Sequence, residues 1–93
     1  MRRLLLRSPA FARDLKGWLK SRPMMAPSIE EALDQLSADA SHPSLRTHKL
    51  RGSLAGCWAC SAGRDLRVVF EYVEHEDAEA ILLLALGTHD QVY

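Results

Sequence analysis

Ile81-Leu82-Leu83-Leu84-Ala85-Leu86 is an unbroken apolar run, and Gly87-Thr88-His89-Asp90-Gln91-Val92-Tyr93 follows it directly. Six consecutive apolar residues bounded by a glycine are typical of a buried strand. Gly87 is expected to break this strand, which would place a histidine and a tyrosine just beyond it. A titratable ring and an aromatic ring at the rim of a sheet indicate a functional site at that rim.

Two further strands are expected before this run. Residues 57–62 form the first of them, and Gly63-Arg64-Asp65 turns the chain into the second, over residues 66–73. An acidic stretch over residues 74–79 then connects to the last strand, over residues 80–86. The second strand carries an apolar side chain at every other position, as a half-buried strand does; these positions are Leu66, Val68, Phe70 and Tyr72.

The first half of the chain predicts a short strand and two helices. Residues 3–6 form the strand, and Ser8-Pro9 is typical of an N-cap followed by proline at the first helical position. Ser28-Ile29-Glu30-Glu31 fits the capping box of a second helix, which fades by Ala40. Residues 45–56 are expected to be irregular. The predicted fold is therefore α+β, of order β-α-α-β-β-β, with a helical hairpin packed on a mostly antiparallel four-stranded sheet. In the first predicted helix, the apolar residues that fall on one face are Phe11, Leu15, Trp18 and Leu19.

Length and charge limit the possible functions. The 93 residues form one domain, 1–93, and twelve basic side chains balance twelve acidic ones. Residues 1–52 hold ten basic and five acidic side chains, and residues 53–93 hold two and seven, so the halves carry +5 and −5. The basic first half could present a positively charged surface that binds phosphate groups. No apolar stretch is long enough to span a membrane or to serve as a secretory signal, so a cytoplasmic location is expected.

Cys57 and Cys60 form a C-x-x-C pair, which raises the alternatives of a metal or a redox site. A four-ligand zinc site would need two further ligands. In a strand, however, residues three apart point to opposite faces. We therefore favour two small buried hydrophobic residues in a reducing cytosol, and we expect neither a metal nor a cofactor.

Four residues are candidates for catalysis because the strand order brings most of them to one rim: His48, Asp65, His89 and Tyr93. Adjacent antiparallel strands alternate direction, so the turn that ends at Asp65 and the segment that begins at Gly87 share a rim. The same parity does not place His48. Taken singly, each histidine is also compatible with a surface residue, and Asp65 with a turn former.

Two imidazoles, a carboxylate and nearby cations suit cleavage of an RNA phosphodiester. One group takes the proton from the ribose 2′-OH, and another protonates the departing 5′-oxygen. Histidine serves either role because its usual pKa lies near 6.5. Tyr93 would stack on a base or position a phosphate. Cations stabilise the additional negative charge of the transition state, and those available are Lys49, Arg51, Arg64 and Arg67.

The segments 48–56, 66–70 and 87–93, together with the predicted element order, resemble the RelE/ParE toxin superfamily, and most of all its YafQ-like branch. The resemblance covers almost the whole chain and is sharpest over residues 42–93. The paired features are H-x-L-x-G-x-x-x-G from His48 to Gly56 and G-T-H-x-x-x-aromatic from Gly87 to Tyr93.

The resemblance implies the toxin of a type II toxin–antitoxin pair, acting as a ribosome-dependent mRNA interferase, which is an endoribonuclease. Its partners would be the cognate antitoxin, the ribosome and mRNA, and operator DNA indirectly through the antitoxin. His48, Asp65, His89 and Tyr93 match family site positions, with His89 as the general acid. Arg64 and Arg67 would supply phosphate contacts.

The chain departs from the YafQ-like pattern at two positions. Ser61 stands where those proteins carry another histidine, and Leu66 stands where they carry tryptophan. The near-neutral net charge also departs from a group that tends to be basic. Two alternatives therefore stay open: a ParE-like gyrase inhibitor without nuclease activity, and a catalytically decayed toxin that only binds its antitoxin.

Overall fold

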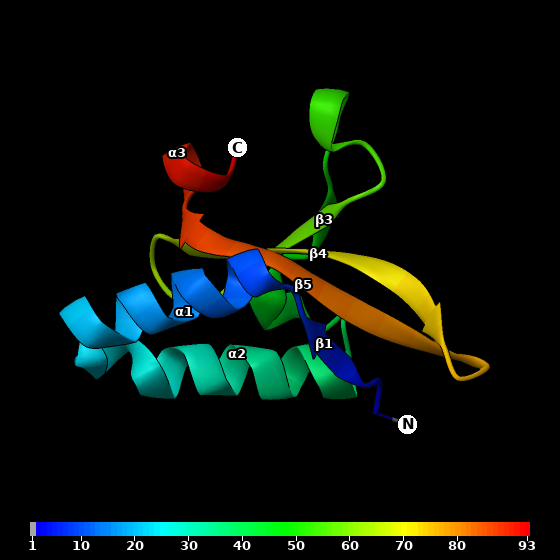
Figure 1. The fold of residues 1–93 in the computed structure, drawn as a ribbon, viewed down its shortest axis with the longest axis horizontal. Helices are drawn as coiled ribbons and strands as arrows, with labels where there is room; N and C mark the ends of the chain where they lie inside the picture. The colour runs from blue at the N-terminus through cyan, green and yellow to red at the C-terminus, as the bar shows by residue number, and fades with distance from the viewer. Residues whose placement is uncertain (1) are drawn as a thin grey trace.

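The computed structural model describes residues 2–93 as two long helices packed on one face of a five-stranded sheet (Figure 1). The strand order is β1-β5-β4-β3-β2; β1 runs parallel to β5, and the other neighbouring strands are antiparallel. The predicted α+β class and the helical hairpin are confirmed. In chain order the elements are β1 (Leu5–Arg7), α1 (Pro9–Ser21), η1 (Pro23–Met25), α2 (Ala26–Ala38), η2 (Pro43–Leu45), β2 (His48–Lys49), η3 (Gly52–Leu54), β3 (Trp58–Ser61), β4 (Leu66–His75), β5 (Ala78–Thr88) and α3 (His89–Val92).

Strand β5 is the centre of the core because it pairs with β1 on one side and β4 on the other. A β-bulge interrupts the second pairing: Val69 is opposite Ala85, but Phe70 is opposite Leu83. The additional residue on β5 lets Leu83 and Leu86, three positions apart, both join the buried core beneath the helices. The bulge thus explains why the apolar run of β5 shows no simple alternation.

Ser8 joins helix α1 to this central strand. Its side chain accepts a hydrogen bond from the Phe11 amide at 3.1 Å, which confirms the predicted N-cap. Its amide donates to the Leu83 carbonyl, and its hydroxyl donates to the carbonyl of Leu84, the residue added at the bulge. One serine therefore starts the helix and satisfies backbone groups where β5 is irregular.

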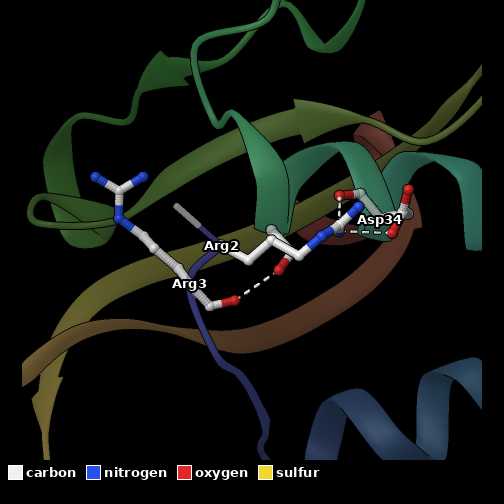
Figure 2. A network of polar contacts seen from close by, with 4 residues as sticks. Arg2, Arg3 and Asp34 are labelled. Atoms are coloured by element: carbon white, nitrogen blue, oxygen red, sulfur yellow. Dashed lines mark hydrogen bonds and ion pairs between the residues drawn. The ribbon is translucent and has the colours of Figure 1, made fainter.

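The segment before β1 is held against α2 by polar contacts (Figure 2). Arg2 donates to the Asp34 carboxylate at 2.7 Å, and the Ser37 hydroxyl donates to the Arg3 carbonyl at 2.6 Å. The Arg3 amide in turn donates to the Ser37 carbonyl. Because the Arg2–Asp34 pair is exposed to solvent, it contributes no more than about 1 kcal/mol to stability. The contacts fix the position of this segment more than they stabilise the fold.

Several predicted boundaries were wrong. The sheet has five strands because residues 48–49, expected to be irregular, pair with β3 as β2; two residues are too few to show a periodic pattern. Helix α2 begins at Ala26, so Ser28 is not its cap. The connection expected over 74–79 is a two-residue turn, where Glu76 and Asp77 both have positive φ, as a type I′ turn requires.

Gly87 does not end the last strand as predicted. Strand β5 continues through it to Thr88, and the short helix α3 follows. Helix α3 lies on the face of the sheet opposite α1 and α2, with η3 on the same side (Figure 1). No helix among residues 2–93 has both the length and the apolar character to cross a bilayer.

Candidate active site

Tyr93 and His48, 45 positions apart in the sequence, meet on the side of the sheet that carries α3. The Tyr93 hydroxyl lies 3.4 Å from His48 Nε2, and His48 Nδ1 lies 3.0 Å from the Arg46 carbonyl oxygen. A carbonyl oxygen only accepts, so Nδ1 carries the proton. In the neutral ring Nε2 then keeps its lone pair and accepts from the Tyr93 hydroxyl. The structure thus supplies the position of His48 that strand parity left open.

The His89 ring packs against the same tyrosine. The ring centroids of His89 and Tyr93 are 4.5 Å apart and the planes nearly perpendicular, at 87°. The His48 and Tyr93 centroids are 6.2 Å apart. Edge-to-face contacts of this kind are favourable for aromatic rings. The tyrosine ring therefore links two imidazoles that belong to distant parts of the chain.

The first turn of α3 positions His89 and Tyr93. Thr88 caps it through a capping box: its side chain accepts from the Gln91 amide, and Gln91 Oε1 accepts from the Thr88 amide at 2.9 Å. The Tyr93 amide donates to the His89 carbonyl at 3.1 Å. No role for Gln91 was predicted from the sequence, although T-x-x-Q is itself a capping-box pattern.

Arg67 lies next to this group on β4. It is opposite Ser61 on one side and Gly87 on the other. Its guanidinium donates to the Ser61 hydroxyl at 3.4 Å and to the Leu66 carbonyl at 3.1 Å. Burial raises the pKa of Tyr93 above its ordinary value, and the positive charge of Arg67 partly offsets that rise. The tyrosine is therefore a neutral hydrogen-bond donor at physiological pH.

Asp65 lies at the rim predicted from strand parity. Leu66 is opposite Thr88, so Asp65, which precedes β4, and His89, which follows β5, leave the sheet at the same end. Within residues 2–93, no hydrogen bond or ion pair joins the Asp65 carboxylate to His89, whose nearest carboxylate is Asp90 at 3.5 Å. The shared rim is confirmed, and a direct catalytic contact of Asp65 stays a prediction.

The four predicted cations do not gather at one place. Arg67 lies beside Tyr93, and Arg64 is exposed in the turn before β4. The Lys49 ammonium lies 5.3 Å from the centre of the Trp58 ring, which packs against the core, so Lys49 faces away from its neighbour His48. Arg51 is exposed at the start of η3. Of the four, Arg67 is the cation whose charge acts on Tyr93, which contacts both histidines.

The two cysteines stand apart from this group. Cys60 is buried in the core, where burial raises the pKa of its thiol to about 12. Cys57 precedes β3 and is half-buried, and burial raises the pKa of its thiol as well. Both thiols are therefore protonated at neutral pH, which makes them weak nucleophiles and weak metal ligands. Among residues 2–93, no three His, Cys, Asp or Glu side chains are placed to hold a metal ion.

Residues 4–93 match the model of the family described as "Bacterial toxin of type II toxin-antitoxin system, YafQ". The chain belongs to the YafQ family. It is therefore the toxin component of a type II toxin–antitoxin system. No curated protein matches the sequence.

Solved structures share the fold at low sequence identity. A metal-bound toxin from Helicobacter pylori is 23% identical, with a TM-score of 0.77 and complete coverage of both chains. The toxin of the E. coli DinJ-YafQ complex is 16% identical, with a TM-score of 0.76, covering 100% of this chain and 99% of that one. A YoeB/ParE toxin from Agrobacterium tumefaciens is 15% identical, with a TM-score of 0.76 and coverages of 92% and 98%. At these identities the likeness establishes the fold alone.

The two departures from the YafQ-like pattern have different structural settings. Leu66 is fully buried among core residues, so that substitution alters the core and not the exposed face of the site. The Ser61 hydroxyl donates to the Gly63 carbonyl at 3.0 Å and accepts from Arg67. Ser61 therefore helps to orient an arginine on the strand next to the paired histidines.

Gly87 is predicted to be essential for docking of α3. A Cβ atom there would lie 2.8 Å from Gln91 Oε1 and 3.2 Å from Val92 Cγ1, so Gly87→Ala must shift the Gln91 side chain that accepts from the Thr88 amide. We expect faster amide hydrogen exchange over residues 89–93 in this variant, because the capping box is disturbed. The matched control is Gly17→Ala in α1, where a Cβ atom meets nothing within 4 Å. Unchanged exchange at α3 in Gly87→Ala would contradict this packing.

Tyr93 is predicted to titrate above the usual tyrosine pKa of about 10, because burial disfavours the phenolate. Replacing Arg67 by glutamine removes a positive charge that favours the phenolate, so the Tyr93 pKa should rise further. Ultraviolet pH titration in a Tyr72→Phe background isolates Tyr93, since these are the two tyrosines of the chain. A Tyr93 pKa that stays the same or falls when Arg67 is replaced would show that the two groups do not interact.

Proposed function

We propose that this toxin is a ribosome-dependent endoribonuclease that cleaves mRNA by attack of a ribose 2′-OH on the adjacent phosphate. The observation that carries the proposal is the contact of Tyr93 with both His48 and His89, beside Arg67. Two imidazoles on one surface supply a proton acceptor and a proton donor at neutral pH. The match to the YafQ family and the sequence resemblance support the same activity.

In this mechanism the 2′-oxygen forms a bond to phosphorus while the bond from phosphorus to the 5′-oxygen breaks. A base removes the 2′-OH proton and an acid protonates the 5′-oxygen, which leaves a 2′,3′-cyclic phosphate and a 5′-hydroxyl. The pentacoordinate transition state gains negative charge on its oxygens, and we assign the Arg67 guanidinium the role of stabilising it.

We assign His48 as the base and His89 as the acid. His48 Nδ1 donates to the Arg46 carbonyl, which leaves Nε2 to accept a proton where Tyr93 now donates. His89 is 62% exposed in its side chain, so it is open to a leaving group. Asp65 leaves the sheet at the same end as His89, and we assign it a share in the proton transfer. Tyr93 holds the two rings in place and offers an aromatic surface for a base.

A protein antitoxin is the expected regulatory partner. The toxin of E. coli with the same fold was crystallised with DinJ. We propose that a cognate antitoxin binds this chain and inhibits it, and that operator DNA is contacted through the antitoxin. The ribosome and its mRNA are the remaining partners of the active toxin.

Primer extension on mRNA from cells that briefly express the chain tests the proposal. Discrete 5′ ends inside translated codons are expected, and His89→Ala should reduce them by about 10²–10⁴-fold because an acid–base catalyst is lost. The matched control is His75→Ala, an exposed histidine at the far end of β4, which should cut as the wild type does.

Other outcomes would point to other functions. Intact mRNA with replication arrest and supercoiling defects would favour a gyrase inhibitor. Intact mRNA with normal growth would indicate a decayed toxin, in line with the absence of a histidine at Ser61. Full cleavage by His89→Ala would refute the assignment of this site.

A further inference from the structure

A cavity of about 500 Å³ lies between α2, η2 and the turn from β3 to β4. Three arginines from separate parts of the chain line it: Arg46 after η2, Arg64 in the turn, and Arg67 on β4. Ser28 on α2 and Ser44 on η2 also line it. Arg46 was not recognised as a site residue from the sequence, because it lies outside both family motifs.

The positive charge of this cavity is not neutralised within the protein. Glu31 is the one acidic side chain among its described lining residues. Within residues 2–93, none of the three guanidinium groups lies within 4.0 Å of a carboxylate. Three like charges around one hollow repel each other, and a bound anion would relieve that repulsion.

Two arginines of the cavity, Arg67 and Arg46, also interact with residues of the candidate active site. Arg67 lines the cavity and also acts electrostatically on Tyr93. The Arg46 carbonyl accepts from His48 Nδ1, so the backbone that orients His48 also carries an arginine of the cavity. Arg46 adopts the left-handed conformation, with φ of 51°, which is uncommon for a residue other than glycine. The cavity and the candidate active site are therefore linked through Arg67 and through the backbone of Arg46.

We propose that this cavity binds a phosphate of the RNA strand next to the phosphate that is cleaved. The inference rests on the proposed nuclease function and adds a binding subsite to it. Guanidinium groups match phosphate oxygens with paired hydrogen bonds, and serine hydroxyls donate to the remaining oxygens. A polyanion is favoured over a single small anion because Arg67 belongs to the cavity and also acts on Tyr93 of the candidate active site.

Binding of a labelled single-stranded RNA with 2′-O-methyl groups throughout tests the subsite, because this probe cannot undergo 2′-OH attack. Fluorescence anisotropy is measured over a range of salt concentrations for the wild type, Arg46→Gln and Arg64→Gln. Each variant should bind about tenfold more weakly at low salt. The slope of log affinity against log salt should fall by about 0.7 for each phosphate that the variant no longer neutralises. Arg7→Gln, on the opposite edge of the sheet, is the matched control and should bind as the wild type does.

The outcomes separate this proposal from the nuclease proposal. If the wild type cuts mRNA but both variants bind the probe with an unchanged slope, the subsite is refuted and the nuclease stands. If the variants lose affinity only for the antitoxin, the cavity is a protein-binding surface and the proposal fails. If probe binding depends on both arginines while His89→Ala alone abolishes cleavage, both proposals hold. Thermal unfolding verifies that each variant is folded. If Arg46→Gln does not fold, because Arg46 has a strained backbone conformation, Arg64→Gln alone tests the subsite.

Discussion

The antiparallel pairing of β4 with β5 is the constraint on which both the core and the site depend. It places Leu66 opposite Thr88 and Arg67 opposite Gly87. On the face toward the helices, this pairing directs apolar side chains of both strands into one core. Toward the other face, it sets an arginine beside the glycine over which α3 packs. A slip of one residue in this register would exchange the two faces and remove the site together with the core.

Helix α3 follows β5 directly, so the register of the sheet decides where its residues His89 and Tyr93 lie. It is only four residues long, too short to be stable by itself, so its position depends on the Thr88 capping box and on close packing over Gly87. Docked in this way, it places Tyr93 in contact with both His48 and His89. A single aromatic side chain thereby brings the start of the meander and the end of the last strand into one site.

Much of this arrangement follows from local sequence patterns, and the remainder is a matter of long-range geometry. Ser8-Pro9 predicted the start of α1, and the alternation along β4 predicted the burial of Leu66, Val68 and Phe70. The alternation was wrong for Val69, which is buried, and for Tyr72, which is only partly buried. The shared rim of Asp65 and His89 followed from strand direction alone. The β-bulge, β2 and α3 were missed because each spans too few residues to show a period. The contact of His48 with Tyr93 was out of reach, because no local pattern encodes where two distant segments meet on a curved sheet.

The central claim is that His48 and His89 act together in one reaction step, and a double-mutant cycle tests it most directly. Single-turnover cleavage of mRNA on purified ribosomes would be measured for the wild type, His48→Ala, His89→Ala and the double variant. Residues that act as a unit are strongly non-additive, so the double variant should be about as slow as the slower single variant. Rate reductions that multiply, or a His48→Ala variant with the wild-type rate, would contradict the account.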